Sequence, residues 1–343
     1  MTSPAISSAP PVDTWLYPVG SGIYCEPGDF YIDPGRKVDR AVITHGHSDH
    51  ARAGHGAVLA TAETIAIMKV RYGDDCAGAF QPLAPGETIS INGVSVRLVP
   101  AGHILGSAQV VIEWAGRRAV ISGDYKRASD PTCAPFELVP CDVFVTEATF
   151  ALPVFRHEKA AHEAEKLLAS LAAEPDRTHL VGAYNLGKCQ RMIRVVRDAG
   201  YDKPIYLHGA VVALTELYQQ LGIDLGELHL VSETDAKAMR GGIVMCPPSA
   251  LGDRWSRRFG DPVTAFASGW MRVRGRGRQL GIELPLVVSD HVDWPELIQT
   301  IIETEAEEIW VTHGREDALV HYLGSIGRKA RALALVGYGE EAE

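Results

Sequence analysis

Three histidines and an aspartate crowded into one short segment make the strongest chemical signal in the sequence. His45, His47, Asp49 and His50 directly follow the apolar run 41–43. Neutral imidazole and carboxylate groups are the ligands that suit zinc and its neighbours in open hydrolytic sites. In a sharp loop, the first two histidines can face one way and the last two residues another. The segment therefore predicts ligands for two ions, whereas the alternative is an accidental polar cluster on a surface loop.

Further ligand candidates follow apolar runs elsewhere in the chain. His103 lies in a glycine-flanked loop, Asp124 in Ser122-Gly123-Asp124-Tyr125 follows an apolar strand, and His313 ends the run 309–312. We predict one ion at His45, His47 and His103, a second at Asp49, His50 and His313, and Asp124 as the bridge between them. The many imidazoles favour zinc, and manganese also fits a mixture of nitrogen and oxygen ligands. The expected cofactor is therefore a pair of divalent cations.

Strands that end at these residues must position them. Alternating side chains around Asn92-Gly93 predict a tight hairpin over 88–98, because this dipeptide favours the positive φ of a two-residue turn. A second hairpin is expected over 109–122, across Ala115-Gly116, and another strand over 142–146.

After residue 155 the pattern changes to alternating helices and strands. Apolar residues recur at helical spacing from 160 to 171. Strands at 179–184 and 205–207 then alternate with helices at 188–199 and 211–221, and strands at 243–245 and 265–267 follow. This order predicts a parallel sheet covered by helices. We divide the chain into a flexible tail (1–13), a metal-binding domain (14–154 and 285–343) and an inserted α/β domain (155–284).

The ligand pattern resembles that of the metallo-β-lactamase superfamily, whose H-x-H-x-D-H loop, later histidine and bridging aspartate occur here in the same order. His313 comes about 190 residues after Asp124, so a domain is inserted between them. This layout resembles the β-CASP nucleases, and Glu147, His291 and His313 match their three additional motifs. The segments 28–34, 182–188 and 267–271 resemble the bacterial DNA ligase-associated exonucleases.

The resemblance implies a fold, an activity and roles for individual residues. The expected fold is an α/β protein, a metallo-β-lactamase αββα sandwich with an inserted β-CASP cap domain. The expected activity is two-metal phosphodiester hydrolysis by a DNA exonuclease, in DNA repair alongside an ATP-dependent DNA ligase and a helicase. A metal-bridging hydroxide would attack phosphorus, with Asp49 in the catalytic set and His291, held by Glu147, protonating the leaving oxygen. Asp33 would support the metal-binding loop, so its loss should weaken metal binding indirectly.

A net charge of −10 requires any nucleic-acid site to be local, since phosphate binding depends on lysine and arginine. Arg272, Arg274, Arg276 and Arg278 are expected on one face of an extended segment, where guanidinium groups bind phosphates. The other expected contacts are Lys188, Arg254, Arg257, Arg258 and Trp270. Ordinary solvated charged loops are the alternative interpretation of these residues.

Three other functions remain open at this point: an RNA-processing ribonuclease of the β-CASP group, a small-molecule metallo-hydrolase, and a non-catalytic nucleic-acid-binding scaffold. The chain start lacks a basic region followed by an apolar block, and no apolar run approaches the roughly 20 residues of a membrane helix. We therefore expect a cytoplasmic protein that does not bind membranes.

Overall fold

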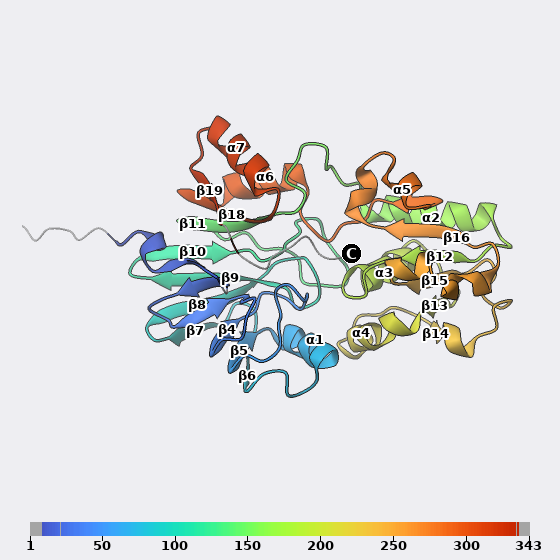
Figure 1. The fold of residues 1–343 in the computed structure, drawn as a ribbon, viewed down its shortest axis with the longest axis horizontal. Coiled ribbons are helices and arrows are strands. Elements are labelled where there is room, and N and C mark those ends of the chain that lie inside the picture. The colour runs from blue at the N-terminus through green and yellow to red at the C-terminus, as the bar shows by residue number, and fades with distance from the viewer. Residues whose placement is uncertain (1–8, 21, 334, 336–343) are drawn as a thin grey trace, which may run out of the picture.

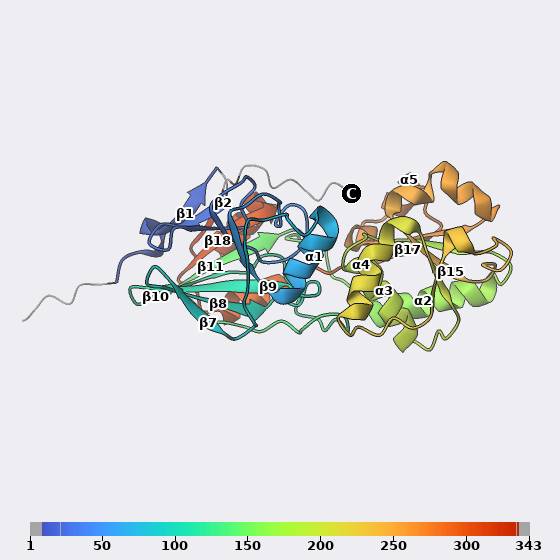
Figure 2. The same ribbon diagram turned by 90° about the horizontal axis from the view of Figure 1, so that it is seen from below.

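The structure is a computed structural model that describes residues 9–20, 22–333 and 335. Two bodies lie side by side: a sandwich of two sheets and a third sheet flanked by helices (Figures 1 and 2). The chain builds most of the sandwich first, crosses to the second body, and returns to the sandwich with its last strands and helices. The second body is thus inserted into the first.

The first sheet of the sandwich has six strands in sequential order. They are β1 (Leu16–Val19), β2 (Gly22–Cys25), β3 (Phe30–Ile32), β4 (Arg40–Val42), β5 (Ala57–Ala60) and β6 (Phe80–Pro82). Helix α1 (Ala62–Tyr72) begins after Thr61, whose side chain accepts the Thr64 N–H. Ile65 and Met68 of this helix pack on Ile43 and Val58, so α1 covers one face of the sheet.

The second sheet has seven strands. Their order is β19 (Ala330–Ala332), β18 (Glu308–Gly314), β11 (Val143–Ala148), β10 (Arg117–Ile121), β9 (Ala108–Trp114), β8 (Val94–Pro100) and β7 (Thr88–Ile91). Both expected hairpins are present, and their turn residues have positive φ: 49° at Asn92 and at Ala115, 84° at Gly93 and 81° at Gly116. Helices α6 (Trp294–Glu303) and α7 (Glu316–Ser325) cover one face of this sheet.

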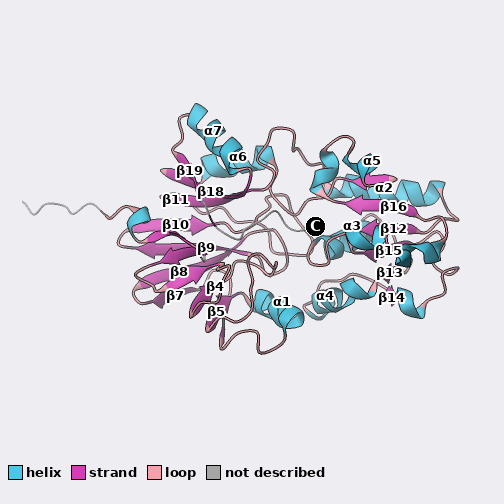
Figure 3. Ribbon diagram, in the orientation of Figure 1, coloured by secondary structure: helices cyan, strands magenta, loops and turns pink. Residues whose placement is uncertain are grey.

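Apolar residues of both sheets fill the space between them, with Phe30 and Val42 on one side and Leu98, Val145 and Trp310 on the other. Separate clusters join each sheet to the helices on its opposite face. The layers therefore run helix, sheet, sheet, helix, and the predicted αββα sandwich is confirmed (Figure 3).

The inserted body contains a parallel sheet of six strands. Their order is β14 (Leu228–Leu230), β13 (Ile205–Leu207), β15 (Ile243–Cys246), β12 (His179–Gly182), β16 (Val263–Ala267) and β17 (Leu284–Leu286). Helices α2 (Ala160–Ala173), α3 (Lys188–Asp198) and α4 (Gly209–Gln220) pack on one face, as expected from the alternating pattern. We call this body, from α2 to β17, the cap.

Two expectations about local structure are wrong. Residues 1–8 of the expected tail lie outside the described residues, but Val12–Thr14 forms a 3-10 helix in which Val12 is buried in the sandwich core. The arginine segment is not extended: Arg272 ends the 3-10 helix η5 (Gly269–Arg272), and helix α5 (Arg276–Gln279) follows. Gly275, at a φ of 92°, makes the left-handed link between the two. No helix in the described ranges is long and apolar enough to cross a membrane.

Candidate metal centre

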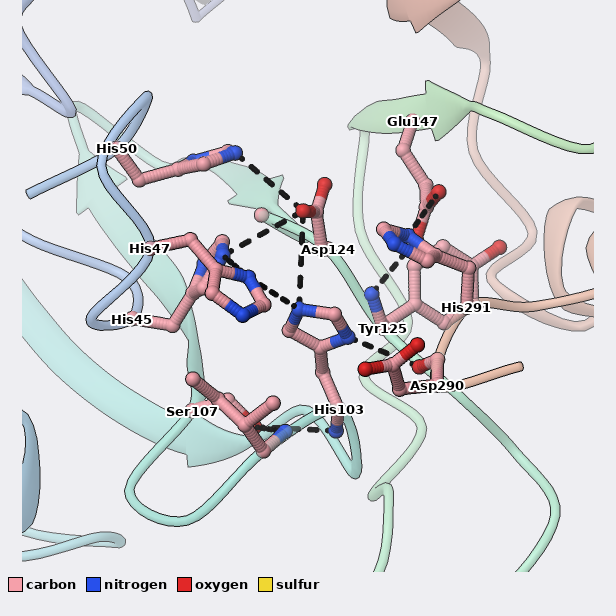
Figure 4. A network of polar contacts seen from close by, with 12 residues as sticks. His45, His47, His50, His103, Ser107, Asp124, Tyr125, Glu147, Asp290 and His291 are labelled. Carbon is pink, nitrogen blue, oxygen red and sulfur yellow. Dashed lines mark hydrogen bonds and ion pairs between the residues drawn. The ribbon is translucent and has the colours of Figure 1, made fainter. Parts of the chain in front are cut away.

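The seven predicted ligands converge at strand ends of the sandwich, next to the cap. Figure 4 shows five of them: His45, His47, His50, His103 and Asp124. His45, His47, Asp49 and His50 occupy the loop after β4, and His103 the loop after β8. Asp124 follows β10, and His313 lies near the end of β18. Strands from both sheets thus deliver ligands to one point.

The first set has the spacing of ligands around a single ion. The Nδ1 atom of His47 lies 3.1 Å from Nε2 of His45 and 3.0 Å from Nε2 of His103. Tetrahedral zinc with nitrogen ligands at about 2.0–2.1 Å would place these atoms about 3.3 Å apart. Three imidazole nitrogens at this spacing fit a divalent metal.

Asp124 lies between this set and the second one. Its Oδ2 atom is 3.4 Å from Nε2 of His45 and also 3.4 Å from Nε2 of His50. Asp49 Oδ2 lies 3.6 Å from the same His50 nitrogen, and the ligand atoms of Asp49, His50 and His313 all lie within 4.8 Å of one another. One carboxylate thus reaches both groups, which is the position expected of a bridging ligand.

Asp33 supports the loop from beneath. One carboxylate oxygen accepts the Thr44 N–H at 2.8 Å, and the other accepts the Thr44 hydroxyl at 2.6 Å and lies 2.7 Å from Nδ1 of His50. The side chain is buried, and its backbone is left-handed at a φ of 43°. These contacts turn His50 Nε2 toward Asp124, so Asp33 is placed to orient this candidate ligand.

Burial keeps several imidazoles neutral. It lowers the pKa of His45 well below the usual value, the pKa of His103 to about 3 and that of His313 to about 4, with neighbouring imidazoles adding to the effect. His50 differs: burial opposes its charge, but Asp124, Asp49 and Asp33 together raise its pKa well above normal. Neutral rings can donate a lone pair to a cation, and the carboxylates around His50 provide negative charge where a second cation would sit.

His291 and Glu147 form a buried pair beside the ligands. The Nδ1 atom of His291 lies 3.0 Å from Oε2 of Glu147, whose other oxygen accepts the Tyr125 N–H at 2.8 Å. Burial alone would lower the pKa of His291, but the Glu147 carboxylate raises it to about 10. The imidazolium form can therefore donate a proton.

A cavity of about 330 Å³ opens over the ligands, at the junction of sandwich and cap. Asp49, Asp124, His291 and His313 line it, together with three of the residues predicted to contact nucleic acid: Lys188, Trp270 and Arg276. Arg254, Arg257, Arg258, Arg272, Arg274 and Arg278 do not line it and are exposed on the cap. The predicted nucleic-acid residues thus divide into a cavity group and a surface group.

Several residues of this cavity were missed by the sequence reasoning. Phe150 packs on Trp270 with ring centroids 5.0 Å apart, and Tyr184 lies under the Lys188 ammonium, 4.2 Å from its ring centroid. Arg315 also lines the cavity, two residues after His313. The pairing of Asp290 with Lys188 at 3.1 Å was missed as well. Arg315 and Asp290 adjoin predicted site residues in sequence, a signal that could have identified them.

The metallo-beta-lactamase superfamily model matches residues 29–178, the part of the chain that holds six of the seven ligands. The chain has a metallo-β-lactamase domain. A solved structure, that of a protein of unknown function from Enterococcus faecalis, is similar to this chain with a TM-score of 0.57 and 12% sequence identity. The match covers 82% of this chain and 76% of that one, and it concerns the fold alone. The family match confirms the predicted resemblance to the metallo-β-lactamase superfamily, and the inserted cap agrees with the predicted layout.

Curated relatives of this chain have names from nucleic-acid metabolism. A "Probable DNA ligase" of Opitutus terrae is 26% identical over 93% of this chain and 31% of its own length. "Ribonuclease TTHA0252" of Thermus thermophilus is 26% identical over 56% of this chain and 51% of its own. "Cleavage and polyadenylation specificity factor subunit 3-I" of Arabidopsis thaliana is 26% identical over 56% and 32%. The chain thus spans about a third to a half of the length of these relatives.

Proposed function

We propose that this protein is a metal-dependent nuclease that removes nucleotides from DNA ends. The observation that carries the proposal is the position of Asp124 Oδ2, equally far from His45 Nε2 and His50 Nε2 in a cavity that also contains His291. Two divalent cations held by the seven ligands, zinc or manganese, would supply an activated water and neutralise charge on the phosphoryl oxygens.

The chain's own residues would do the rest of the chemistry. The protonated His291 ring, held at Nδ1 by Glu147, faces the cavity and would protonate the leaving oxygen. Lys188, Arg276 and Arg315 give the cavity cationic walls that would hold phosphate groups. Such walls and the cap that supplies two of them favour a nucleic-acid substrate over a small neutral one.

DNA is the substrate that the proposal names, because the relative called a probable DNA ligase aligns with nearly the whole chain, cap included. We extend the proposal to DNA repair in the cytoplasm beside an ATP-dependent DNA ligase and a helicase. The second candidate is RNA processing, which is favoured by the ribonuclease-named relative that aligns with 56% of the chain.

The test is digestion of DNA and RNA strands of equal sequence, labelled separately at each end, with zinc or manganese. The wild-type protein should release labelled mononucleotides from DNA, and Asp124→Ala and His291→Ala should not. His229→Ala, which removes an exposed histidine of the cap, is the matched control and should cut like wild type. Undiminished cleavage by Asp124→Ala would overturn the proposed site, and faster cleavage of RNA would replace DNA by RNA as the substrate.

A further inference from the structure

Two imidazoles of the first ligand set are held by groups that lie outside the loops of the sandwich. The Nε2 atom of His47 lies 3.3 Å from the Leu186 carbonyl oxygen, which belongs to the cap. The Nδ1 atom of His103 lies 2.9 Å from the Asp290 carbonyl oxygen, in the segment where the chain leaves the cap (Figure 4). Because a carbonyl only accepts, these contacts place a proton on His47 Nε2 and on His103 Nδ1. The other nitrogen of each ring then carries the lone pair toward the ion.

The second ligand set is supported differently. His50 is held at Nδ1 by Asp33, which lies in the sandwich itself. Asp49, His50 and His313 themselves belong to the sandwich, the first two in the loop after β4 and the third near the end of β18. The two ion positions therefore differ in their dependence on the cap.

The Leu186 carbonyl is fixed from both sides. Gln190, a fully buried side chain of α3, accepts the Gly187 N–H at 2.8 Å and donates to the Asn185 carbonyl at 2.9 Å. Gly187 has a φ of 85°, and a Cβ there would overlap the Cγ2 methyl of Ile104, next to the ligand His103. This loop of the cap thus touches the sandwich at the metal-binding loops and leaves no room for a side chain.

A buried ion pair ties the second carbonyl to the same helix. Lys188 Nζ lies 3.1 Å from Asp290 Oδ1, and both side chains are almost entirely buried. A movement of the start of α3 would therefore disturb Leu186 and Asp290 together, and with them His47 and His103.

We propose that the cap is part of the ion site formed by His45, His47 and His103. The Leu186 carbonyl is the positioning group: it fixes the tautomer and ring orientation of His47, so affinity for this ion depends on how the cap packs on the sandwich. The ion at Asp49, His50 and His313 depends instead on Asp33, which holds His50 from within the sandwich. Loss of such outer hydrogen bonds weakens metal affinity by about 10- to 100-fold.

Gly187→Ala tests the proposal in the full chain, because the added methyl group must displace the loop or Ile104. Gly200→Ala is the matched control: this cap glycine also has a left-handed backbone, with a φ of 93°, but a Cβ there would have no atom within 4 Å. Zinc affinities of the two sites are measured by chelator competition, without nucleic acid. Cobalt(II) binding is followed by its visible spectrum, which reports coordination geometry.

We expect wild type and Gly200→Ala to bind two ions alike. Gly187→Ala should bind one ion as tightly as wild type and the other about 10- to 100-fold more weakly, with a changed cobalt spectrum for that one site. Equal weakening at both sites would indicate general destabilisation and overturn the proposal, as would unchanged binding at both.

A second variant guards against misfolding of Gly187→Ala. Gln190→Ala adds no atom to the interface but frees the Gly187 N–H and the Asn185 carbonyl that flank Leu186. Its control is Thr215→Ala, which removes the third partner of Gln190 and a hydrogen bond within α4 to the Val211 carbonyl, but no bond to the loop at Leu186. The same loss at a single site in Gln190→Ala, and not in its control, supports the proposal; two unchanged sites in a folded Gln190→Ala reject it.

Discussion

Replacing Asp33 by asparagine should weaken the ion site that contains His50 and leave the other site unchanged. In the native protein the carboxylate accepts two hydrogen bonds from Thr44 and faces Nδ1 of His50 at 2.7 Å. An asparagine side chain has the same shape but one acceptor oxygen and one NH₂ donor. If the amide oxygen accepts the Thr44 N–H, the NH₂ group faces the Nδ1 proton of His50. If the amide is flipped, the NH₂ group faces the Thr44 N–H instead. Either orientation leaves two donors face to face.

The size of the effect can be worked out in two ways. A hydrogen bond to a charged group contributes about 1.5–3 kcal/mol, and the loss of an outer partner of a metal-ligating histidine costs about 10- to 100-fold in affinity. Since 1.4 kcal/mol is a factor of ten, the two ranges agree. The backbone should not respond, because asparagine tolerates the left-handed conformation that Asp33 adopts. We therefore expect a loss of about 1.5–3 kcal/mol in binding free energy at one ion site.

Asp29→Asn is a closely matched control. Asp29 also has a left-handed backbone, with a φ of 53°, but it is exposed and its carboxylate accepts a hydrogen bond from the hydroxyl of Tyr24, which is not a predicted metal ligand. Stepwise zinc affinities of both variants are measured by calorimetry and chelator competition. If Asp33→Asn binds both ions as tightly as Asp29→Asn does, the support assigned to Asp33 is wrong. Loss of both ions together would point to a collapsed loop instead of one misoriented ligand.

Three further predictions follow from the site and its surroundings. Glu147→Gln should reduce turnover about 100-fold or more while both ions stay bound. It should also shift the activity optimum to lower pH: without the carboxylate, burial lowers the pKa of His291, and the protonated ring is lost as pH rises through that lower value. Rate profiles from pH 5 to 9 with metal analysis check this, and an unchanged profile would exclude His291 as the proton donor. Arg274→Gln and Arg278→Gln should weaken DNA binding without changing metal content. Each should also reduce the slope of log affinity against log salt concentration by roughly 0.7–1, measured by fluorescence anisotropy. Slopes equal to that of wild type would show that these exposed arginines do not contact DNA. Chelation of the metal should lower the melting temperature of the protein, and added zinc or manganese should restore it. Each ion present at 100 times its Kd stabilises the fold by about 2.7 kcal/mol. A melting temperature that does not change with metal would contradict a buried metal centre.

Local signals in the sequence carried much of the fold. The hairpin at Asn92-Gly93 follows from the backbone freedom of that dipeptide, and α6 begins after Asp293, whose side chain accepts the Glu296 N–H at its first turn. The helical turns around Gly275 were missed, because arginine spacing alone does not distinguish an extended strand from two short helical turns separated by glycine. Glycine allows both backbones, so the composition of this segment left its conformation open.

Residue types and their order after apolar runs were enough to name the seven ligand candidates, because metal chemistry restricts the choice to a few side chains. Partners contributed by the main chain could not be predicted in this way. The Leu186 carbonyl that meets His47 has no signature in its side chain, since any residue offers the same oxygen. Its role depends on the packing of the cap against the sandwich, which involves residues 139 positions apart in the chain.

Anomalous diffraction from crystals grown with zinc or manganese would test the central claim most directly. Two peaks should lie on either side of the Asp124 carboxylate, one within ligand distance of His45, His47 and His103 and one within ligand distance of Asp49, His50 and His313. A structure with these side chains turned apart and no metal peak beside Asp124, at saturating metal, would contradict the account.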